Sequence, residues 1–367
     1  MKIMHIAQFL GIGGLEKIIF HLAIEQMRLG HEVSVYIYDW EREWVSFFRE
    51  SGINVITPPL KKEGYDFSLL RRIKHDIKGQ DIIHTHDLNP LMYLAPIKAM
   101  SILSKLHPKL IHTTHGLDHL ENYPRSNFYE KMVSPLADQI IGVSQSVYDY
   151  YTTKLGIPKH KVHRVDNGVQ IFDNKVTTEL KSAKKKELCN KYNLDESKPI
   201  ISNVARVVPL KDQAFLMNEI SKNKNVQLLI IGPSGDEKYY KSLESLQTEN
   251  CKMTGGQSGI NDLLLGSDLF VSASTHEGIP VAVLEAMGIS TPCLISDIPG
   301  HSIIKDKAPR SVCTYKLGSS EDFNIKLNEI LSSTQKQDEL AQYGKEAVIN
   351  HFSVMAMNKH YLEIYKS

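Results

Sequence analysis

The 367-residue sequence contains no long hydrophobic run, few cysteines and almost no excess of charge of either sign. No segment reaches the roughly 18 consecutive apolar residues of a membrane-spanning helix, so we expect no transmembrane segment. The 4 cysteines are widely spaced and form no C-x-x-C pair, which argues against a zinc site or a disulfide framework and indicates a reducing compartment. A net charge of +1 gives no electrostatic reason to expect a nucleic-acid partner.

The length predicts two domains, since a typical domain holds roughly 100–200 residues. Residues 1–10 contain too short an apolar run for a signal peptide and lead into a glycine turn, so we interpret them as a first strand and expect no export. A lysine-rich interval at 174–198 separates two similar halves, and it fits either a linker or a solvated helix. We place the boundary near residue 170.

Both halves alternate short apolar runs with helix-like segments, which predicts α/β domains with doubly wound parallel sheets. The expected strands lie at 3–9, 31–38, 54–57, 82–86, 110–113, 139–143 and 161–165 in the first half, and at 200–205, 226–231, 269–272 and 292–296 in the second. After residue 332 the pattern is helical to the end of the chain.

Two carboxylates stand eight residues apart across a turn-to-helix transition, Glu277 before the turn and Glu285 inside the predicted helix 281–287. Gly278 and Pro280 mark the turn, and the free N–H groups of the first helical turn favour a phosphate. Glu285 could then accept the hydroxyls of a ribose, and Glu277 those of a hexose under the diphosphate. The alternative is an ordinary helix start with acidic residues that bind nothing.

Two cations follow the first strand of the second half, Arg206 and Lys211. They could neutralise the charge on a departing nucleoside diphosphate, a task that some transferases give to Mg²⁺ held by aspartates. The sequence has no D-x-D motif to hold such a metal. Asp212 offers Lys211 a competing partner, which makes the lysine a weaker candidate than the arginine. A solvated arginine and lysine remain the alternative.

The first strand is followed by the glycine-rich loop 11–17, where a doubly wound sheet binds anions. A dinucleotide fingerprint would need glycine at position 16, and Glu16 stands there. His115 ends a later strand and could contact a sugar hydroxyl, although it is one of 16 histidines. His84 and His86 alternate on another strand without a carboxylate or cysteine to complete a metal site.

These segments resemble the retaining glycosyltransferases of family 4, and the resemblance spans nearly the whole chain. Residues 277–285 match the E-x(7)-E motif of that family, and 205–212 are similar to G-R-L-x-x-x-K-G, with Ala205 and Asp212 in place of the two glycines. The loop 13–16 is similar to G-G-x-E, and His115 matches the strand-end histidine of the family.

The resemblance implies a GT-B fold, in which two Rossmann-like domains face a cleft. Residues 1–170 would form the acceptor-side domain, residues 171–351 would bind the nucleotide sugar, and a last helix at 352–367 would pack back on the first domain. The implied catalytic residues are Glu277, His115, Arg206 and Lys211. The implied substrate-binding residues are Gly13, Gly14, Glu16, Gly232, Thr254, Gly255, Gly278, Ile279, Pro280, Val281 and Glu285.

The implied activity is metal-independent, retaining transfer of a hexose-type sugar from a nucleotide sugar, with UDP-sugar favoured over GDP-sugar, to a glycan or lipid-linked glycan. Retention would need no protein base, whereas inversion would need one at Glu16, His115 or Asp118. No cofactor or metal is expected. Relatives of this kind build lipopolysaccharide or other surface polysaccharide at the cytoplasmic face of the membrane.

Two other classes stay open. One is a non-catalytic sugar-nucleotide-binding subunit, and the other is another GT-B enzyme, such as a sugar-nucleotide epimerase or a phosphorylase. The segment 93–109 carries Lys98, Lys105 and Lys109 among apolar residues. We interpret it as a helix with solvent-facing lysines, which leaves peripheral membrane contact at most. The sequence does not specify the oligomeric state.

Overall fold

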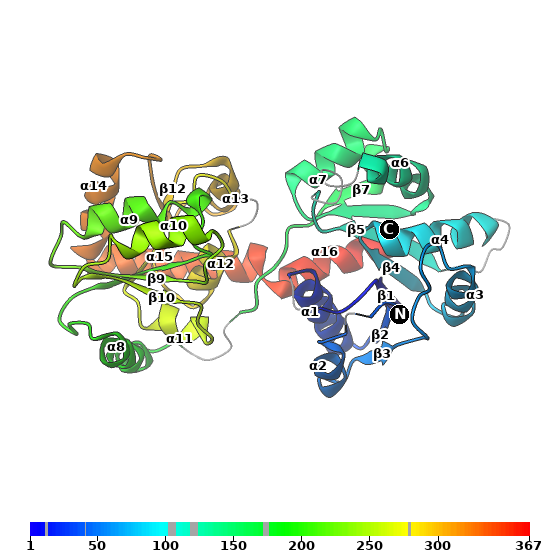
Figure 1. Ribbon diagram of the computed structural model, residues 1–367, viewed down its shortest axis with the longest axis horizontal. Helices are drawn as coiled ribbons and strands as arrows, with labels where there is room; N and C mark the ends of the chain where they lie inside the picture. Colours follow the sequence, from blue (N-terminus) through cyan, green and yellow to red (C-terminus); the bar gives the residue numbers. More distant parts are fainter. Residues whose placement is uncertain (12–13, 41, 102–107, 118–123, 172–175, 278–279) are drawn as a thin grey trace. The chain divides into compact units, whose positions relative to one another are not determined.

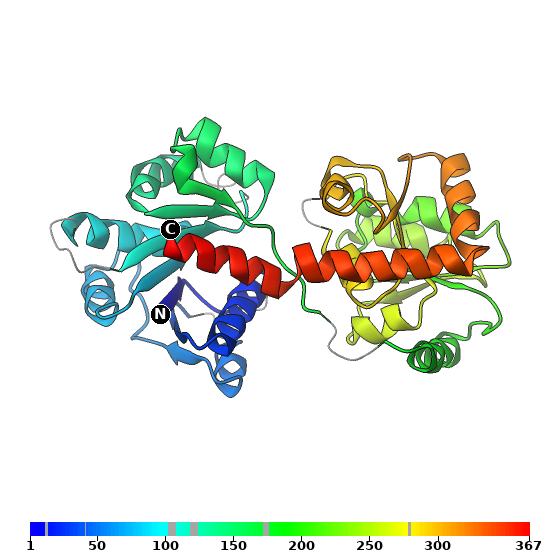
Figure 2. The same ribbon diagram turned by 180° about the vertical axis from the view of Figure 1, so that it is seen from behind.

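The computed structural model describes residues 1–11, 14–40, 42–101, 108–117, 124–171, 176–277 and 280–367. These residues form two compact units (Figure 1). The N-terminal unit combines Met1–Gly168 with Val354–Ser367, and the C-terminal unit is Val169–Ser353. The chain therefore passes from one unit to the other beside the predicted boundary near residue 170, and both chain ends lie in the N-terminal unit (Figure 2).

The N-terminal unit is built on a parallel sheet of 7 strands in the order β3-β2-β1-β4-β5-β6-β7. The strand order reverses between β1 and β4, which run side by side with Ile3 opposite Ile82. The strands are β1 (Lys2–Ala7), β2 (Glu32–Ile37), β3 (Asn54–Ile56), β4 (Ile82–His86), β5 (Lys109–Thr114), β6 (Gln139–Gly142) and β7 (Val162–Arg164).

Helices cover both faces of this sheet. Successive strand residues point to opposite sides, and each side packs against its own helices. Ile3 packs with α1 and α16 on one face, whereas Met4 packs with α3 and α4 on the other. Figure 2 shows α16 (red) lying across the sheet. The helices are α1 (Gly14–Arg28), α2 (Val45–Glu50), α3 (Phe67–Asp76), α4 (Leu88–Ser101), α6 (Pro124–Val133), α7 (Gln145–Asp149) and α16 (Val354–Lys366).

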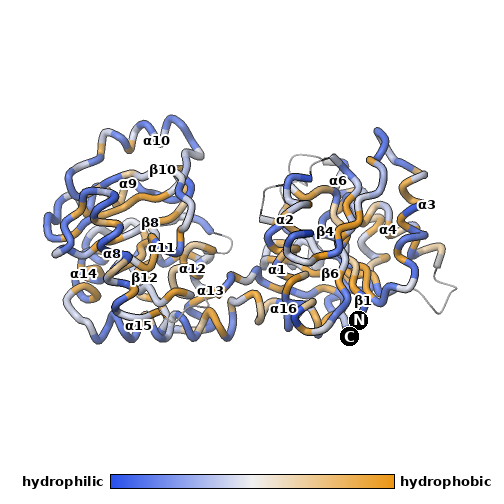
Figure 3. Tube along the Cα trace, turned by 90° about the horizontal axis from the view of Figure 1, so that it is seen from below, coloured by the Kyte–Doolittle hydropathy of each residue, from blue (hydrophilic) through white to orange (hydrophobic). Residues whose placement is uncertain are grey.

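The C-terminal unit repeats this architecture with a parallel sheet of 6 strands in the order β10-β9-β8-β11-β12-β13. Its strand order reverses between β8 and β11. The strands are β8 (Ile200–Val204), β9 (Gln227–Ile231), β10 (Cys251–Gly255), β11 (Leu269–Ser272), β12 (Cys293–Ser296) and β13 (Cys313–Tyr315). Figure 3 shows hydrophobic stretches (orange) along inner strands such as β1 and β8.

Helices also flank both faces of the second sheet. The lysine-rich interval contains one of them, α8, so the interpretation as a helix is correct and the linker alternative is wrong for the described part of that interval. The helices are α8 (Thr178–Tyr192), α9 (Gln213–Ile220), α10 (Glu237–Glu244), α11 (Ile260–Leu265), α12 (Val281–Gly288), α13 (Pro299–Lys307), α14 (Ser320–Leu331) and α15 (Thr334–Ala347).

The two parallel sheets confirm the predicted fold class. All eleven predicted strands are present within one or two residues of their expected ends, but β10 and β13 were not predicted. Both are edge strands of the second sheet and are only partly buried, so their sequences lack a continuous apolar run. All four cysteines are unpaired thiols, as their spacing predicted.

The described helices are all too short or too polar to cross a bilayer. Two of the lysines in the segment 93–109 contact the protein. Lys98 pairs with Asp138 at 2.6 Å, and Lys109 donates to the carbonyl oxygen of Ile364 at 2.9 Å. Lys105 lies outside the described residues. The interpretation as one helix with solvent-facing lysines is therefore wrong for these two residues, because Lys98 on α4 is only 13% exposed and Lys109 lies on β5.

Candidate functional site

The C-terminal unit has a cavity of about 230 Å³ at the point where its strand order reverses. Ligands bind to doubly wound sheets at such a point, outside the carboxyl ends of the strands. Residues after β8, residues around the end of β11 and the start of α12 line this cavity. Five residues proposed from the sequence meet here, namely Arg206, Lys211, Glu277, Pro280 and Val281.

Glu277 and Lys211 form an ion pair on the wall of this cavity. The Lys211 Nζ lies 2.5 Å from the Glu277 Oε1, and the Ser274 hydroxyl donates to the same oxygen at 2.7 Å. The two side chains are 23% and 13% exposed, so the pair is shielded from bulk water but still open to a ligand. A carboxylate held in this way keeps its position, and the lysine beside it balances its charge.

Asp212 does not pair with Lys211, so the competition expected from the sequence is wrong. The backbone of Asp212 adopts a left-handed conformation with φ of 43°, and its side chain accepts a hydrogen bond from the Phe215 N–H at 3.3 Å. Asp212 thus caps the N-terminus of α9. This turn directs Lys211 toward Glu277 instead.

The loop that carries Arg206 is fixed by a close approach of two backbone segments. The Ala205 N–H donates to the Ile231 carbonyl oxygen at 3.0 Å, and a side chain at Gly232 would place its Cβ 1.8 Å from the Ala205 oxygen. Gly232 has φ of +154°, and only glycine fits both constraints. The Gln213 side chain also donates to the Arg206 carbonyl oxygen at 3.0 Å. The Arg206 side chain itself is exposed.

Other predicted residues of this unit lie outside the lining of the cavity. Gly232 and Gly255 adjoin one another at the ends of β9 and β10, with the Gly232 N–H donating to the Gly255 carbonyl oxygen at 2.9 Å. Thr254 precedes Gly255 on β10 and is partly exposed. Glu285 is half-buried in the middle of α12. Gly278 and Ile279 are not among the described residues.

Three residues near Glu277 were missed by sequence reasoning. Asn203 is buried at the end of β8, donates to the Val271 carbonyl oxygen at 2.9 Å and lines the cavity, while its Oδ1 has no partner among the described residues. Gly300 lies against the Glu277 backbone, where an added Cβ would come within 2.2 Å of the Glu277 carbonyl oxygen. The strand-end position of Asn203 is the one signal that could have identified it.

His301, the third of them, is buried beside this cluster. Its Nδ1 bonds to the Ser296 carbonyl oxygen at 2.7 Å, and its Nε2 has no partner among the described residues. Burial lowers the pKa of His301, while the Ser296 carbonyl and the negative charge of Glu277 oppose that shift. His301 is therefore a neutral imidazole at neutral pH. It lies 24 residues after Glu277, on another helix, and nothing in its local sequence indicates this proximity.

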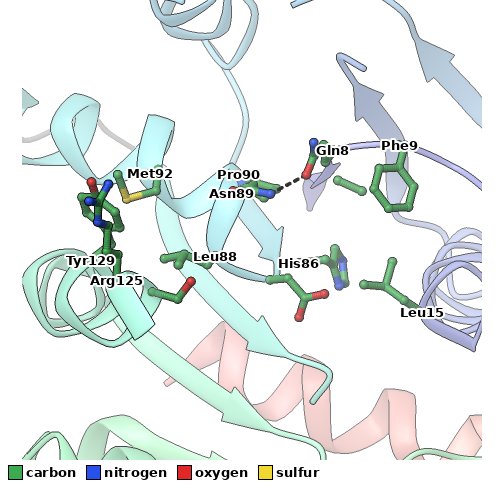
Figure 4. A pocket seen from close by; sticks show the side chains of 13 residues that line it. Gln8, Phe9, Leu15, His86, Leu88, Asn89, Pro90, Met92, Arg125 and Tyr129 are labelled. Atoms are coloured by element: carbon green, nitrogen blue, oxygen red, sulfur yellow. Dashed lines mark hydrogen bonds between the residues drawn. The ribbon is translucent and has the colours of Figure 1, made fainter. Parts of the chain in front are cut away.

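The N-terminal unit has a larger cavity, about 650 Å³, at its own reversal of strand order, where residues after β1 and after β4 meet. Its lining is mostly apolar, and its polar groups come from Gln8, His86, Asp87, Asn89, Arg125, Ser126 and Tyr129. Figure 4 shows Arg125, Met92 and Tyr129 at one end and Phe9 and Leu15 at the other.

Gln8 and Asn89 connect the two loops of this cavity. The Asn89 amide donates to the Gln8 oxygen at 2.5 Å (Figure 4). The Gln8 amide donates to Asp39 at 2.8 Å. The residues predicted from the sequence lie nearby in the chain. Gly14 begins α1, and Glu16 is buried in its first turn. Gly13 is not described.

His115 follows β5 and is partly exposed. Its Nε2 lies 2.9 Å from the Nδ1 of His86, and its backbone N–H donates to Asp87 at 2.9 Å. Burial lowers the pKa of His115, and nearby Asp87 opposes that shift. The side chain is therefore neutral at neutral pH, which suits a hydrogen bond to a hydroxyl better than a contact with a negative charge.

Three buried histidines, His5, His84 and His86, have ring nitrogens within 4.8 Å of one another. Such a group could hold a metal ion, but its nitrogens already have partners. His5 Nδ1 and His86 Nε2 are 3.0 Å apart, and His84 bonds to the Thr113 hydroxyl and the Tyr365 hydroxyl, both at 2.7 Å. A metal ion would have to displace these hydrogen bonds without any carboxylate from this group to balance its charge.

The chain matches two models of protein families. Residues 12–171 match the model for Glycosyltransferase Family 4, and residues 184–347 match the model for Glycosyl transferases group 1. The two matches together cover most of the sequence.

Among characterised proteins, the chain is 23% identical to the N-acetyl-alpha-D-glucosaminyl L-malate synthase of Bacillus anthracis, over 87% of this chain and 83% of that protein. It is also 23% identical to the UDP-Gal:alpha-D-GlcNAc-diphosphoundecaprenol alpha-1,3-galactosyltransferase of Escherichia coli, over 80% of this chain and 72% of that protein.

Solved structures of similar fold include a glycosyltransferase from Rickettsia africae, with a TM-score of 0.79, 20% identity and coverage of 100% of this chain and 97% of that one. Another is the Anabaena protein HepE in complex with UDP and glucose, with a TM-score of 0.75, 18% identity and coverage of 100% of this chain and 99% of that one. The predicted fold therefore matches solved structures along its full length.

Proposed function

Because this chain belongs to the group 1 glycosyltransferases of family 4, with the GT-B fold, we propose that it transfers a hexose-type sugar from a nucleotide sugar to a glycan or lipid-linked glycan. A UDP-sugar is favoured over a GDP-sugar, since the HepE structure contains UDP and the E. coli relative is named for a UDP-sugar. The observation that carries the proposal is the cavity in the C-terminal unit where Arg206, Lys211 and Glu277 meet.

In the proposed donor complex, Glu277 accepts hydrogen bonds from hexose hydroxyls. Its Oε1 already receives Lys211 and Ser274, so the second carboxylate oxygen is left for the sugar. Glu285 contacts the ribose, and the first turn of α12 receives phosphate through its backbone N–H groups. This division of roles is supported by the start of α12 at Val281, which lines the same cavity as Glu277.

We propose that Arg206 and Lys211 supply the positive charge that stabilises the departing diphosphate, without a metal ion. Both cations line the cavity, and the sequence has no D-x-D motif to hold Mg²⁺. In the proposed reaction, the acceptor hydroxyl attacks the anomeric carbon on the face that the diphosphate leaves, and a phosphate oxygen takes the proton. This route retains the anomeric configuration and needs no carboxylate nucleophile.

The cavity of the N-terminal unit is our candidate for the acceptor site. Its apolar and aromatic lining suits the face of a sugar or the start of a lipid chain, and Arg125 suits a phosphate. The E. coli relative is named for a diphosphoundecaprenol-linked acceptor, which has both groups. Such an acceptor would place the reaction at the cytoplasmic face of the membrane, within polysaccharide or lipopolysaccharide synthesis, with peripheral contact at most.

Incubation with a panel of UDP-, GDP- and ADP-sugars, with and without glycan and diphospholipid-linked acceptors, tests this proposal. We expect transfer from a UDP-sugar, and NMR of the new linkage should show the anomeric configuration of the donor. Binding without transfer or hydrolysis of any donor would indicate a non-catalytic subunit. Conversion of the free nucleotide sugar would indicate an epimerase, and an inverted product would contradict the retaining mechanism.

A further inference from the structure

A line of hydrogen-bonded side chains runs from His115 into the core of the N-terminal unit. His115 Nε2 meets His86 Nδ1 at 2.9 Å, His86 Nε2 meets His5 Nδ1 at 3.0 Å, and His5 Nε2 meets the Gln26 Oε1 at 2.9 Å. Four segments distant in sequence supply these groups, namely the end of β5, β4, β1 and α1. Only His115 is partly exposed, because His5, His86 and Gln26 are at most 2% exposed.

All three imidazoles of this line are neutral at neutral pH. Burial lowers the pKa of His5 to about 4, holds that of His86 well below its usual value and lowers that of His115. A neutral imidazole has one N–H donor and one acceptor nitrogen. Each hydrogen bond in the line therefore dictates the direction of the next one.

The inner end of the line sets that direction. The Gln26 amide nitrogen donates to the Tyr365 hydroxyl at 3.4 Å, and the Tyr365 hydroxyl is bonded to His84 Nδ1 at 2.7 Å. The Gln26 oxygen then faces His5 as an acceptor, so His5 must carry its proton on Nε2. His86 in turn must donate from its Nε2 to His5, and His115 must donate from its Nε2 to His86.

These proton positions leave the Nδ1 of His115, a partly exposed residue, without a proton. Its Nδ1 accepts no hydrogen bond from any described residue and would be an acceptor, not a donor. The opposite orientation of the Gln26 amide would reverse every proton in the line and turn the same nitrogen into a donor. The hydrogen-bonding role of His115 is thus decided at Gln26, three hydrogen bonds away.

We propose that Gln26, His5 and His86 are positioning residues that hold His115 in its Nε2–H tautomer, so that its Nδ1 accepts a hydrogen bond from a hydroxyl of the substrate. This inference rests on the proposed function for the identity of the substrate, a sugar or glycan. The line adds no charge to the site. It makes His115 specific for a hydroxyl donor, and a substrate oxygen without a proton would find no donor there.

Long-range ¹⁵N–¹H correlation NMR of the full-length protein labelled at histidine tests the tautomer directly, because protonated and bare ring nitrogens have well-separated shifts. The His115 signals are assigned by their loss in His115→Gln. We expect a protonated Nε2 and a bare Nδ1 in the wild type. A protonated Nδ1 would overturn the proposal. The proposal would also be overturned if Zn²⁺ or Co²⁺ added to the wild type shifts the signals of His5, His84 and His86, because these nitrogens would then bind the metal ion.

Two variants disturb the inner end of the line. Gln26→Met removes the acceptor, and Tyr365→Phe removes the partner that orients the Gln26 amide while it preserves the ring. Both should produce a mixture of His115 tautomers and lower kcat by about two- to ten-fold, the scale of one hydrogen bond, with donor KM within two-fold of wild type. An unchanged tautomer in both variants would contradict the relay.

Gln139→Met is the matched control. Gln139 Oε1 bonds to His163 Nε2 at 2.8 Å in the same sheet but outside the line. This variant should alter the His163 signals and leave the His115 signals and kcat unchanged. A shifted tautomer with wild-type kcat in Gln26→Met would overturn the positioning role and leave the proposed function intact. A wild type that transfers no sugar would remove the proposed function, while the NMR shifts would still decide whether the relay exists.

Discussion

The N-terminal and C-terminal units form their cavities at equivalent points of the same topology but line them with different chemistry. The C-terminal cavity is small, about 230 Å³, and contains an ion pair and a second cation. The N-terminal cavity is larger, about 650 Å³, and mostly apolar, with Arg125 and Asp87 as its charged residues and the neutral His86 in its lining. The ion pair and the second cation suit a departing diphosphate, whereas an apolar lining with one arginine suits an acceptor that carries both an apolar chain and a phosphate.

This difference also appears in how each unit stabilises its polar groups. Lys211 and Glu277 stay partly exposed, so a ligand can reach charges that already balance one another. His5, His84 and His86 are buried, and this burial lowers the pKa of each side chain and keeps it neutral. The predictions below follow from this contrast.

The largest expected effect is that of Glu277→Gln in the C-terminal cavity. The variant loses the negative charge that orders Lys211 and receives the sugar hydroxyls, so kcat should fall by about 10²–10³-fold, the scale for one preorganised group at a transition state. UDP affinity, measured by calorimetry, should stay within a few-fold. Glu219→Gln is the control, because Glu219 is a carboxylate that is also paired with a lysine, Lys222, at 2.7 Å, but lies outside the cavity. A parallel loss of UDP affinity would refute the separate roles of Glu277 and Glu285.

The histidines should make the N-terminal unit the acid-sensitive one. Burial lowers the pKa of His5 from 6.5 to about 4, so the unfolded chain binds protons in this range and the native state does not. The free energy of unfolding should therefore fall as pH drops from about 6.5 to 4, by about 1.4 kcal/mol per pH unit for each such histidine. Above pH 6.5 these histidines should not change the free energy of unfolding with pH.

Tryptophan fluorescence during urea unfolding reports on the N-terminal unit, because both tryptophans of the sequence, Trp40 and Trp44, lie there. Between pH 6.5 and 5, His5→Gln should reduce the slope of the free energy of unfolding against pH by about 1.4 kcal/mol per pH unit, the contribution of one histidine. Equal slopes for the variant and the wild type would show that His5 does not stay neutral in the folded state.

Gly232→Ala tests the backbone support of the charged cavity. The new Cβ would clash with the Ala205 carbonyl oxygen at 1.8 Å and displace the loop that carries Arg206. We expect a loss of about 1–3 kcal/mol in the free energy of unfolding and weaker UDP binding. Gly256→Ala is the matched control, since its nearest contact would be an ordinary 3.5 Å to Pro233. If the two variants bind UDP equally well, the close approach at Gly232 has no role in the site.

Arg125→Ala tests the N-terminal cavity as the acceptor site. Loss of one cation that receives a phosphate should raise KM for a diphospholipid-linked acceptor about ten-fold and leave KM for the donor unchanged. Arg49→Ala serves as the control, because Arg49 bonds to the Val55 carbonyl oxygen in the same unit and does not line the cavity. An increase in donor KM instead would assign the cavity to the other substrate.

Five residues that line the charged cavity were predicted from the sequence, namely Arg206, Lys211, Glu277, Pro280 and Val281, whereas the buried histidine line was not. Glu277 and Arg206 follow the ends of strands whose apolar runs are clear, so the topology alone brings them to one edge of the sheet. The predicted pairing of Asp212 with the neighbouring Lys211 was wrong, because Asp212 adopts a left-handed conformation and caps α9. The ion pair between Lys211 and Glu277 joins residues 66 positions apart and has no local signal.

The histidine line could not be predicted, since it depends on side chains from separate elements meeting in the core. His5 and His86 are 81 positions apart, and Tyr365 and His84 are 281 positions apart. Each of these residues alone looks like an ordinary polar residue within an apolar strand or helix. The same limit explains β13, a three-residue edge strand whose pairing with β12 is visible only in the fold.

The central claim is that side-chain cations in the C-terminal cavity replace a metal ion, and donor turnover after chelation tests it most directly. The enzyme is treated with EDTA, dialysed and assayed for sugar transfer from its UDP-sugar donor, with and without added Mg²⁺ or Mn²⁺. Since Arg206, Lys211 and the start of α12 line the cavity, we predict the same rate in every sample. Loss of activity on chelation, with recovery on addition of Mg²⁺ or Mn²⁺, would contradict the account.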